Sequence, residues 1–104
     1  MTYDAFWLRY LRAHSRADTR LMHFVGTSLA LACLLGAIAL LNWRLLITAL
    51  LVGYGFAWVA HFGLERNRPE TFGHPFWSLG SDVRMLALFL TGRLGAELHR
   101  AGIG

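Results

Sequence analysis

Two long apolar stretches constrain the fold of this chain more than any other feature of its sequence. Residues 21–41 contain no charged side chain, and residues 45–64 are also uncharged until Glu65 follows them. A helix of that length reaches roughly 30 Å at about 1.5 Å per residue, which is the thickness of the hydrocarbon layer of a bilayer. A soluble protein would have to be much larger to bury two such helices. The sequence therefore predicts two membrane-spanning helices.

The composition also favours lipid over water as the surroundings of the chain. Apolar residues make up 56% of the 104 residues and charged residues 15%, whereas an average globular domain is about 25% charged. The net charge of +4 comes from arginine alone. The arginines flank the apolar stretches and accompany no nucleic-acid fold signature, so we expect no nucleic-acid partner. The single cysteine, Cys33, excludes an internal disulfide.

The short connection between the two stretches predicts a helical hairpin. Only residues 42–44 separate them, so the start of the first span and the end of the second lie on the same side of the membrane. That side also receives nearly all of the arginines, namely Arg9, Arg12, Arg16, Arg20, Arg66, Arg68, Arg84, Arg93 and Arg100. By the positive-inside rule this side, with both chain termini, is cytoplasmic.

The flanking segments predict two further helices outside the spans. Residues 3–15 place arginines on one helical stripe and aromatic and aliphatic side chains on other faces, which suits the headgroup boundary. Residues 81–99 predict a final helix that is too short and too charged for a membrane span. The expected fold is thus an all-α integral membrane protein with a single domain over residues 1–104. It comprises a two-span helical hairpin, an N-terminal amphipathic helix and a C-terminal interfacial or re-entrant helix.

Histidines near the ends of the two spans indicate a candidate metal site. His23 lies near the start of the first span and His61 near the end of the second, so an antiparallel hairpin brings them to similar depth. His14 precedes His23 by nine residues and can fold back toward the same point. His61 and Glu65 are four residues apart on one helical face. Nitrogen and oxygen ligands of this kind suit Fe(II), although a packing role for each histidine stays open.

The remaining titratable residues divide into two groups. Arg66 and Arg68 lie beside the candidate site and could hold a substrate carboxylate by bidentate hydrogen bonds, but flanking arginines also orient membrane proteins. His74 and His99 fall in loop or terminal positions, where an exposed histidine needs no functional explanation.

Four stretches together resemble a known family. They are residues 6–14, His23 with Gly26, residues 58–69 and residues 78–85. They are similar to the fungal protein for the metabolism of phytosphingosine to odd-numbered fatty acids and to its short bacterial relatives, the 2-hydroxy fatty acid dioxygenases. The pattern His-x3-Glu-x-Asn-Arg-Pro, which begins at His61, is the most specific part of the resemblance.

The resemblance implies an Fe(II)-dependent dioxygenase that acts on 2-hydroxy fatty acids. Such an enzyme uses O2 to convert its substrate to the fatty acid one carbon shorter, with loss of CO2. Carried over to this chain, the histidines of the family match His14, His23 and His61, its acidic position matches Glu65, and His74 has no counterpart. The bacterial relatives imply the bacterial inner membrane, with membrane lipid around the spans. Two helices bury little surface alone, which leaves room for a homodimer.

Two other classes of membrane protein compete with this interpretation. The first is a non-catalytic scaffold or assembly protein, whose histidines only pack or bind metal structurally; its iron content would separate it from the enzyme. The second is the di-iron hydroxylase and desaturase class. Those enzymes need histidine boxes such as HxxxH and HxxHH, and this chain has five histidines without such a box.

Overall fold

The computed structural model describes residues 1–103, and within these residues the regular elements are all helices. The elements in chain order are α1 (Tyr3–Arg12), α2 (Ala17–Ala39), α3 (Trp43–Val59), the π-helix η1 (Ala60–Glu65), the 3-10 turn η2 (Glu70–Phe72), α4 (Pro75–Leu90) and α5 (Leu94–Arg100). The all-α prediction is confirmed.

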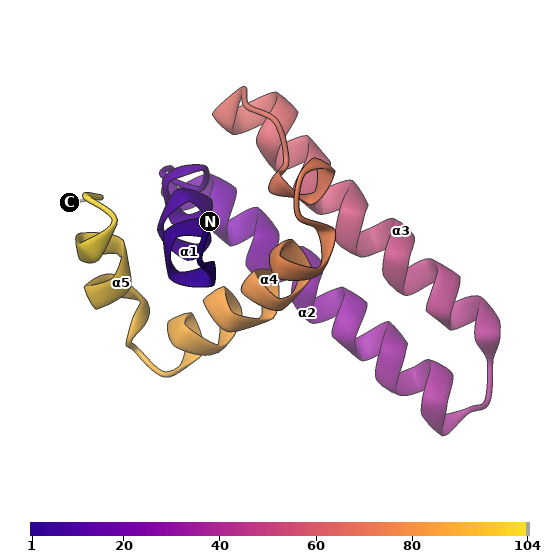
Figure 1. The fold of residues 1–104 in the computed structure, drawn as a ribbon. Helices are drawn as coiled ribbons and strands as arrows, with labels where there is room; N and C mark the ends of the chain where they lie inside the picture. The colour runs from indigo at the N-terminus through magenta and orange to yellow at the C-terminus, as the bar shows by residue number, and fades with distance from the viewer. Residues whose placement is uncertain (104) are drawn as a thin grey trace.

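Helices α2 and α3 form the predicted antiparallel hairpin, with η1 continuing α3 beyond Val59 (Figure 1). The turn between them is tight because the side chain of Asn42 accepts a hydrogen bond from the Arg44 backbone N–H at 3.1 Å, which caps the start of α3. The helices approach closely at Gly26, where an added Cβ would lie 2.5 Å from the Cβ of Phe56. A small residue is therefore required at this crossing.

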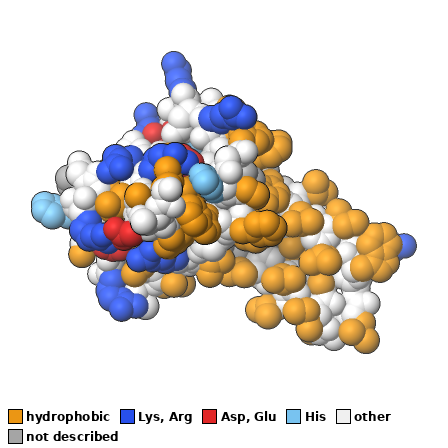
Figure 2. Space-filling view, viewed as in Figure 1, with side chains coloured by type: hydrophobic (Ala, Val, Ile, Leu, Met, Phe, Trp, Pro, Cys, Tyr) orange, Lys and Arg blue, Asp and Glu red, His pale blue; other side chains and the backbone are white. Residues whose placement is uncertain are grey.

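The hairpin leaves most of its apolar surface uncovered. The segments Ala17–Ala39 and Trp43–Glu65 are long and apolar enough to cross a membrane. In the most apolar 18 residues of each segment, 17% are buried. Figure 2 shows apolar side chains covering most of the half of the molecule that this hairpin forms, with most of the charged side chains gathered at the opposite half. The core helix of a soluble protein would instead be mostly covered.

The other helices build a compact head around the start of α2. Here α1, α4 and α5 pack together (Figure 1) over a core formed by Phe6, Trp7, Tyr10, Leu11, Phe24, Met85, Leu86, Leu94 and Ala101. The expectation that the apolar face of residues 3–15 meets the headgroup boundary is wrong, because α4 and α5 cover that face. The helix also ends at Arg12, three residues earlier than predicted.

The prediction of one final helix over residues 81–99 is also wrong, since two helices occupy this region. Helix α4 begins at Pro75, whose fixed φ suits the first turn of a helix, where an N–H is not needed. It ends before Gly92, which has φ +72°, and α5 begins at Leu94. Met85 and Leu86 of α4 pack into the head core. The interfacial or re-entrant placement of this region stays a prediction.

Glu97 on α5 accepts hydrogen bonds from side chains on three helices of the head. Its carboxylate accepts hydrogen bonds from the indole Nε1–H of Trp7 at 3.0 Å, from Nη2 of Arg84 at 3.2 Å and from Nη1 of Arg100 at 3.0 Å. Chiefly because of the hydrogen bond from Arg100, the pKa of the Glu97 carboxyl is lowered from its ordinary value. One side chain thereby connects α1, α4 and α5.

We expect Glu97→Ala to destabilise the head by about 1–3 kcal/mol, because it leaves the buried N–H of Trp7 without an acceptor. Glu97→Gln retains an oxygen acceptor and should cost less. Thermal unfolding in detergent, followed by circular dichroism, measures both variants. Equal melting temperatures for the wild type and Glu97→Ala would contradict this role.

The lowered pKa also predicts the behaviour of the protein in acid. The contribution of the Glu97 carboxylate is complete above its ordinary pKa of 4.5 and is lost as the pH falls through the lower value of the folded protein. The wild type should therefore lose stability across that acid range more steeply than Glu97→Gln. If the stability of both proteins falls equally steeply with decreasing pH, Glu97 does not contribute.

Candidate metal centre

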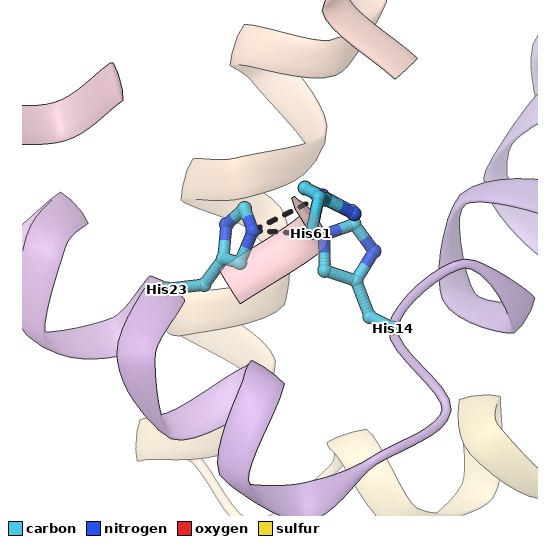
Figure 3. A group of neighbouring side chains, drawn as sticks. All are labelled: His14, His23 and His61. Carbon is cyan, nitrogen blue, oxygen red and sulfur yellow. Dashed lines mark hydrogen bonds between the residues drawn. The ribbon is translucent and has the colours of Figure 1, made fainter. Parts of the chain in front are cut away.

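Three buried histidines converge where the hairpin joins the head (Figure 3). His14 comes from the loop between α1 and α2, His23 from the second turn of α2, and His61 from η1. The Nε2 atom of His23 lies 3.0 Å from that of His14 and 3.3 Å from that of His61. One ring nitrogen from each residue lies within 4.8 Å of the others, so the group could hold a metal ion.

The irregular end of the second hairpin helix positions His61. The π-helix η1 widens the last turn, a feature that frequently accompanies functional sites. Arg66 then adopts a left-handed conformation with φ 57° and ends the helix. This reversal lets the backbone N–H of Asn67 donate to the carbonyl of His61 at 2.9 Å. Asn67 is thereby held beside the ring of His61.

The outer nitrogens of His14 and His61 both donate hydrogen bonds. Nδ1 of His14 lies 2.6 Å from the backbone carbonyl of Tyr10, which can only accept. Nδ1 of His61 lies 2.7 Å from Oδ1 of Asn67. The orientation of that amide follows from its other end, because Nδ2 of Asn67 donates to the carbonyl of Ala13 at 2.9 Å. In both rings the proton therefore lies on Nδ1.

The outer nitrogen of His23 faces a carboxylate. Nδ1 of His23 lies 3.5 Å from Oδ1 of Asp82 on α4, and the hydroxyl of Tyr10 donates to the same oxygen. Burial, and next the charge of Asp82, raise the pKa of Tyr10 well above its ordinary value, so the hydroxyl keeps its proton and stays a donor. An acceptor oxygen thus lies next to Nδ1 of every histidine in the group.

This arrangement leaves the Nε2 lone pairs of His14 and His61 directed at Nε2 of His23, which lies within hydrogen-bond distance of both (Figure 3). Burial, and next the nearby His23 and His61, lower the pKa of His14 well below its ordinary value, so this imidazole is neutral at pH 7. Neutral imidazole is the form that binds metals, and an acceptor on the other ring nitrogen is the usual partner of a metal-bound histidine. The donor set therefore fits a metal ion that prefers nitrogen ligands.

The chain matches the sequence model of a known family over residues 1–94. The description of that family is Mpo1-like, 2-hydroxy-palmitic acid dioxygenase Mpo1-like. The chain belongs to the Mpo1-like family. No curated protein and no solved structure matches it. The matched range contains all three histidines, and the resemblance inferred from the sequence is confirmed.

Glu65 lies at the edge of the site of this Mpo1-like protein and outside the histidine group. Its Oε1 accepts a hydrogen bond from the backbone N–H of Arg16 at 2.5 Å, and its Oε2 accepts one from Oγ of Ser15 at 3.1 Å. These contacts join the end of η1 to the loop that carries His14. The structure therefore brings together three of the four predicted ligands and gives the carboxylate of Glu65 other partners.

Arg66 and Arg68 lie outside the histidine group as well. Both are exposed, and they line a surface pocket together with Phe62, Asn67 and Phe72. The guanidinium of Arg68 lies 4.9 Å from the ring centroid of Phe72. Asn67 connects this pocket to the outer edge of His61.

The other two histidines have separate surroundings. The ring of His74 stacks on Trp77 with centroids 5.1 Å apart, and it lies at the start of α4. His99 is exposed near the end of α5. Neither belongs to the histidine group.

Two residues that lie next to the histidine rings were not predicted as site residues from the sequence of this Mpo1-like protein. Asn67 falls within the quoted His-x3-Glu-x-Asn-Arg-Pro pattern, and its spacing from His61 is the one signal that could have revealed its role. Asp82 follows His23 by 59 residues and lies on α4, so nothing local in the sequence connects the two.

Proposed function

We propose that this Mpo1-like protein is an Fe(II)-dependent dioxygenase that shortens 2-hydroxy fatty acids by one carbon. The reaction converts R–CHOH–COOH and O2 to R–COOH, CO2 and H2O. The C1–C2 bond breaks, C1 leaves as CO2, C2 is oxidised to a carboxylic acid, and O2 is the oxidant. The observation that carries the proposal is the set of three inward Nε2 atoms, each backed by an acceptor at Nδ1.

His14, His23 and His61 would hold the metal. Bound Fe(II) would supply the redox chemistry that lets O2 react with the 2-hydroxy acid. Three protein ligands leave positions free for other molecules, as oxygenase chemistry requires. The dioxygenase description of the family supports iron over other metals that bind imidazole.

The surrounding residues orient the rings and hold the site together. Tyr10 keeps its proton on the phenol oxygen and presents it to Asp82, which faces His23. Asn67 fixes the tautomer of His61. Glu65, through the backbone N–H of Arg16, positions the loop of His14, and we assign it this role in place of metal binding.

The proposal also places the hairpin in a membrane. Helices α2 and α3 with η1 would span the bilayer, with the arginine-rich head and both termini in the cytoplasm. In a bacterium the membrane would be the inner one, with lipid around the apolar half. A homodimer through the exposed hairpin stays part of the proposal.

Arg66 and Arg68 would draw the substrate carboxylate toward the head. We expect Arg68→Ala to raise KM about tenfold with little change in kcat, since a hydrogen bond to a charged group contributes about 1.5–3 kcal/mol. Arg44→Ala is the matched control, because Arg44 lies at the opposite end of the hairpin. An unchanged KM in Arg68→Ala would show that this arginine does not bind the substrate.

The direct test supplies 2-hydroxypalmitate and O2 to Fe(II)-loaded protein in detergent and measures the products by mass spectrometry. The proposal predicts the acid one carbon shorter, formed only with O2 and lost on addition of a chelator. If the protein demonstrably holds iron and forms no such product, the substrate assignment is wrong. If it holds neither iron nor product, the scaffold interpretation replaces the enzyme.

A further inference from the structure

A groove between α2, α3 and α4 begins at the histidine group. It has a volume of about 180 Å³, and His23 and Asp82 line one end of it. Thr27 follows one turn further along α2. Beyond this point the lining side chains are almost entirely apolar and come from both helices of the hairpin. The groove therefore has one polar end, which is lined by one histidine of the candidate metal centre and by the carboxylate that faces its Nδ1.

The groove runs lengthwise along the hairpin. On α2 its lining extends from His23 to Leu34, eleven residues that correspond to about 16 Å of helix. On α3 the lining extends to Leu46, close to the turn that joins the two helices. Its apolar end therefore lies at the end of the hairpin that is furthest from the head (Figure 1).

Small residues set the width of the groove along its length. An added Cβ on Gly53 would lie 3.3 Å from the Cβ of Ala30, so the two helices nearly touch there. Ala49 and Ala30 also line the groove. A narrow slot of this kind suits a chain of methylene groups better than a branched or ring-shaped ligand.

We propose that this groove holds the alkyl tail of a 2-hydroxy fatty acid, with the carboxyl end at His23 and the tail directed toward Leu34 and Leu46. The far end of the groove then determines how long a tail the protein accepts. The inference rests on the proposed function for the identity of the head group. The observations that select an alkyl tail are the single polar end, the presence of His23 of the histidine group at that end and the almost entirely apolar lining elsewhere.

The first test measures binding without turnover. A 2-hydroxy fatty acid with a diazirine at the end of its tail is photolysed with the protein in detergent, and the labelled residues are mapped by mass spectrometry. The expected labels fall on Leu34, Leu46 and Leu50, which line the groove. Leu35 and Leu51, their outward-facing neighbours on the same helices, serve as internal controls. Equal labelling of both sets would overturn the proposal.

The second test compares two neighbouring substitutions on α2. Leu34→Trp fills the far end of the groove and should lower kcat/KM for the longest tails about tenfold, while short tails are turned over as in the wild type. Leu35→Trp points away from the groove and should leave the length preference unchanged. A uniform loss over all lengths in Leu34→Trp, with the same result in Leu46→Trp, would contradict the proposal.

The two tests separate failure of the groove from failure of the proposed function. If the wild type turns over no 2-hydroxy acid but the tail probe labels the groove residues, the groove binds an alkyl tail and the reaction has been assigned wrongly. If turnover occurs but the label falls evenly on both sets of leucines, the reaction stands and the groove assignment fails.

Discussion

Replacing His23 with alanine is expected to weaken Fe(II) binding by more than about 100-fold and to abolish turnover of 2-hydroxypalmitate. Loss of a partner behind a metal ligand already costs about 10–100-fold in metal affinity, and loss of the ligand itself should cost more. His23 is central to the group, because its Nε2 atom lies 3.0 Å and 3.3 Å from those of the other two histidines. Iron titration and product analysis on the same preparation measure both effects.

His99→Ala is the matched control for this experiment. His99 is exposed on α5 and lies outside the histidine group, so its removal should change neither iron binding nor turnover. A His23→Ala protein that keeps iron as the wild type does would show that the three histidines pack together without binding metal.

Replacing Asn67 with alanine is expected to weaken Fe(II) binding about 10–100-fold while His14, His23 and His61 stay in place. The variant removes the oxygen that accepts from Nδ1 of His61 at 2.7 Å. It also leaves the carbonyl of Ala13 without its donor, so a loss of about 1–3 kcal/mol in stability should accompany the weaker binding. Iron titration and thermal unfolding measure the two losses separately.

Asn67→Asp separates the two roles of this side chain. The aspartate keeps an acceptor for Nδ1 of His61 but cannot donate to Ala13, so it should retain more iron affinity than Asn67→Ala. Asn42→Ala, at the opposite end of the hairpin, removes the cap of α3 and should lower stability without changing iron affinity. Wild-type iron binding by Asn67→Ala would contradict the orienting role.

The hairpin and the convergence of its histidines could be predicted from the sequence for a simple physical reason. A connection as short as residues 42–44 forces the two uncharged helices to run antiparallel. His23 and His61 then come to the same level. The position of His14 followed because a short loop limits how far it can lie from His23.

The surroundings of the site could not be predicted because they depend on contacts between distant parts of the chain. An amphipathic pattern does not distinguish a face that meets lipid from one that meets protein. The apolar face of α1 meets protein, since Trp7 is buried in the head core and donates to Glu97 of α5. The partner of Tyr10 is Asp82, 72 residues away. Glu65 shares a helical face with His61, but its carboxylate accepts hydrogen bonds from Ser15 and from the backbone N–H of Arg16. Local spacing contains none of this information.

The central claim is that three imidazole Nε2 atoms hold iron, and iron analysis combined with X-ray absorption spectroscopy tests it most directly. Protein purified without oxygen and loaded with Fe(II) should contain about one iron per chain, with imidazole nitrogens as prominent ligands, as the three-histidine group predicts. The imidazole signal should disappear in His23→Ala. Iron that binds without imidazole ligands, or that binds equally well to His23→Ala, would contradict the account.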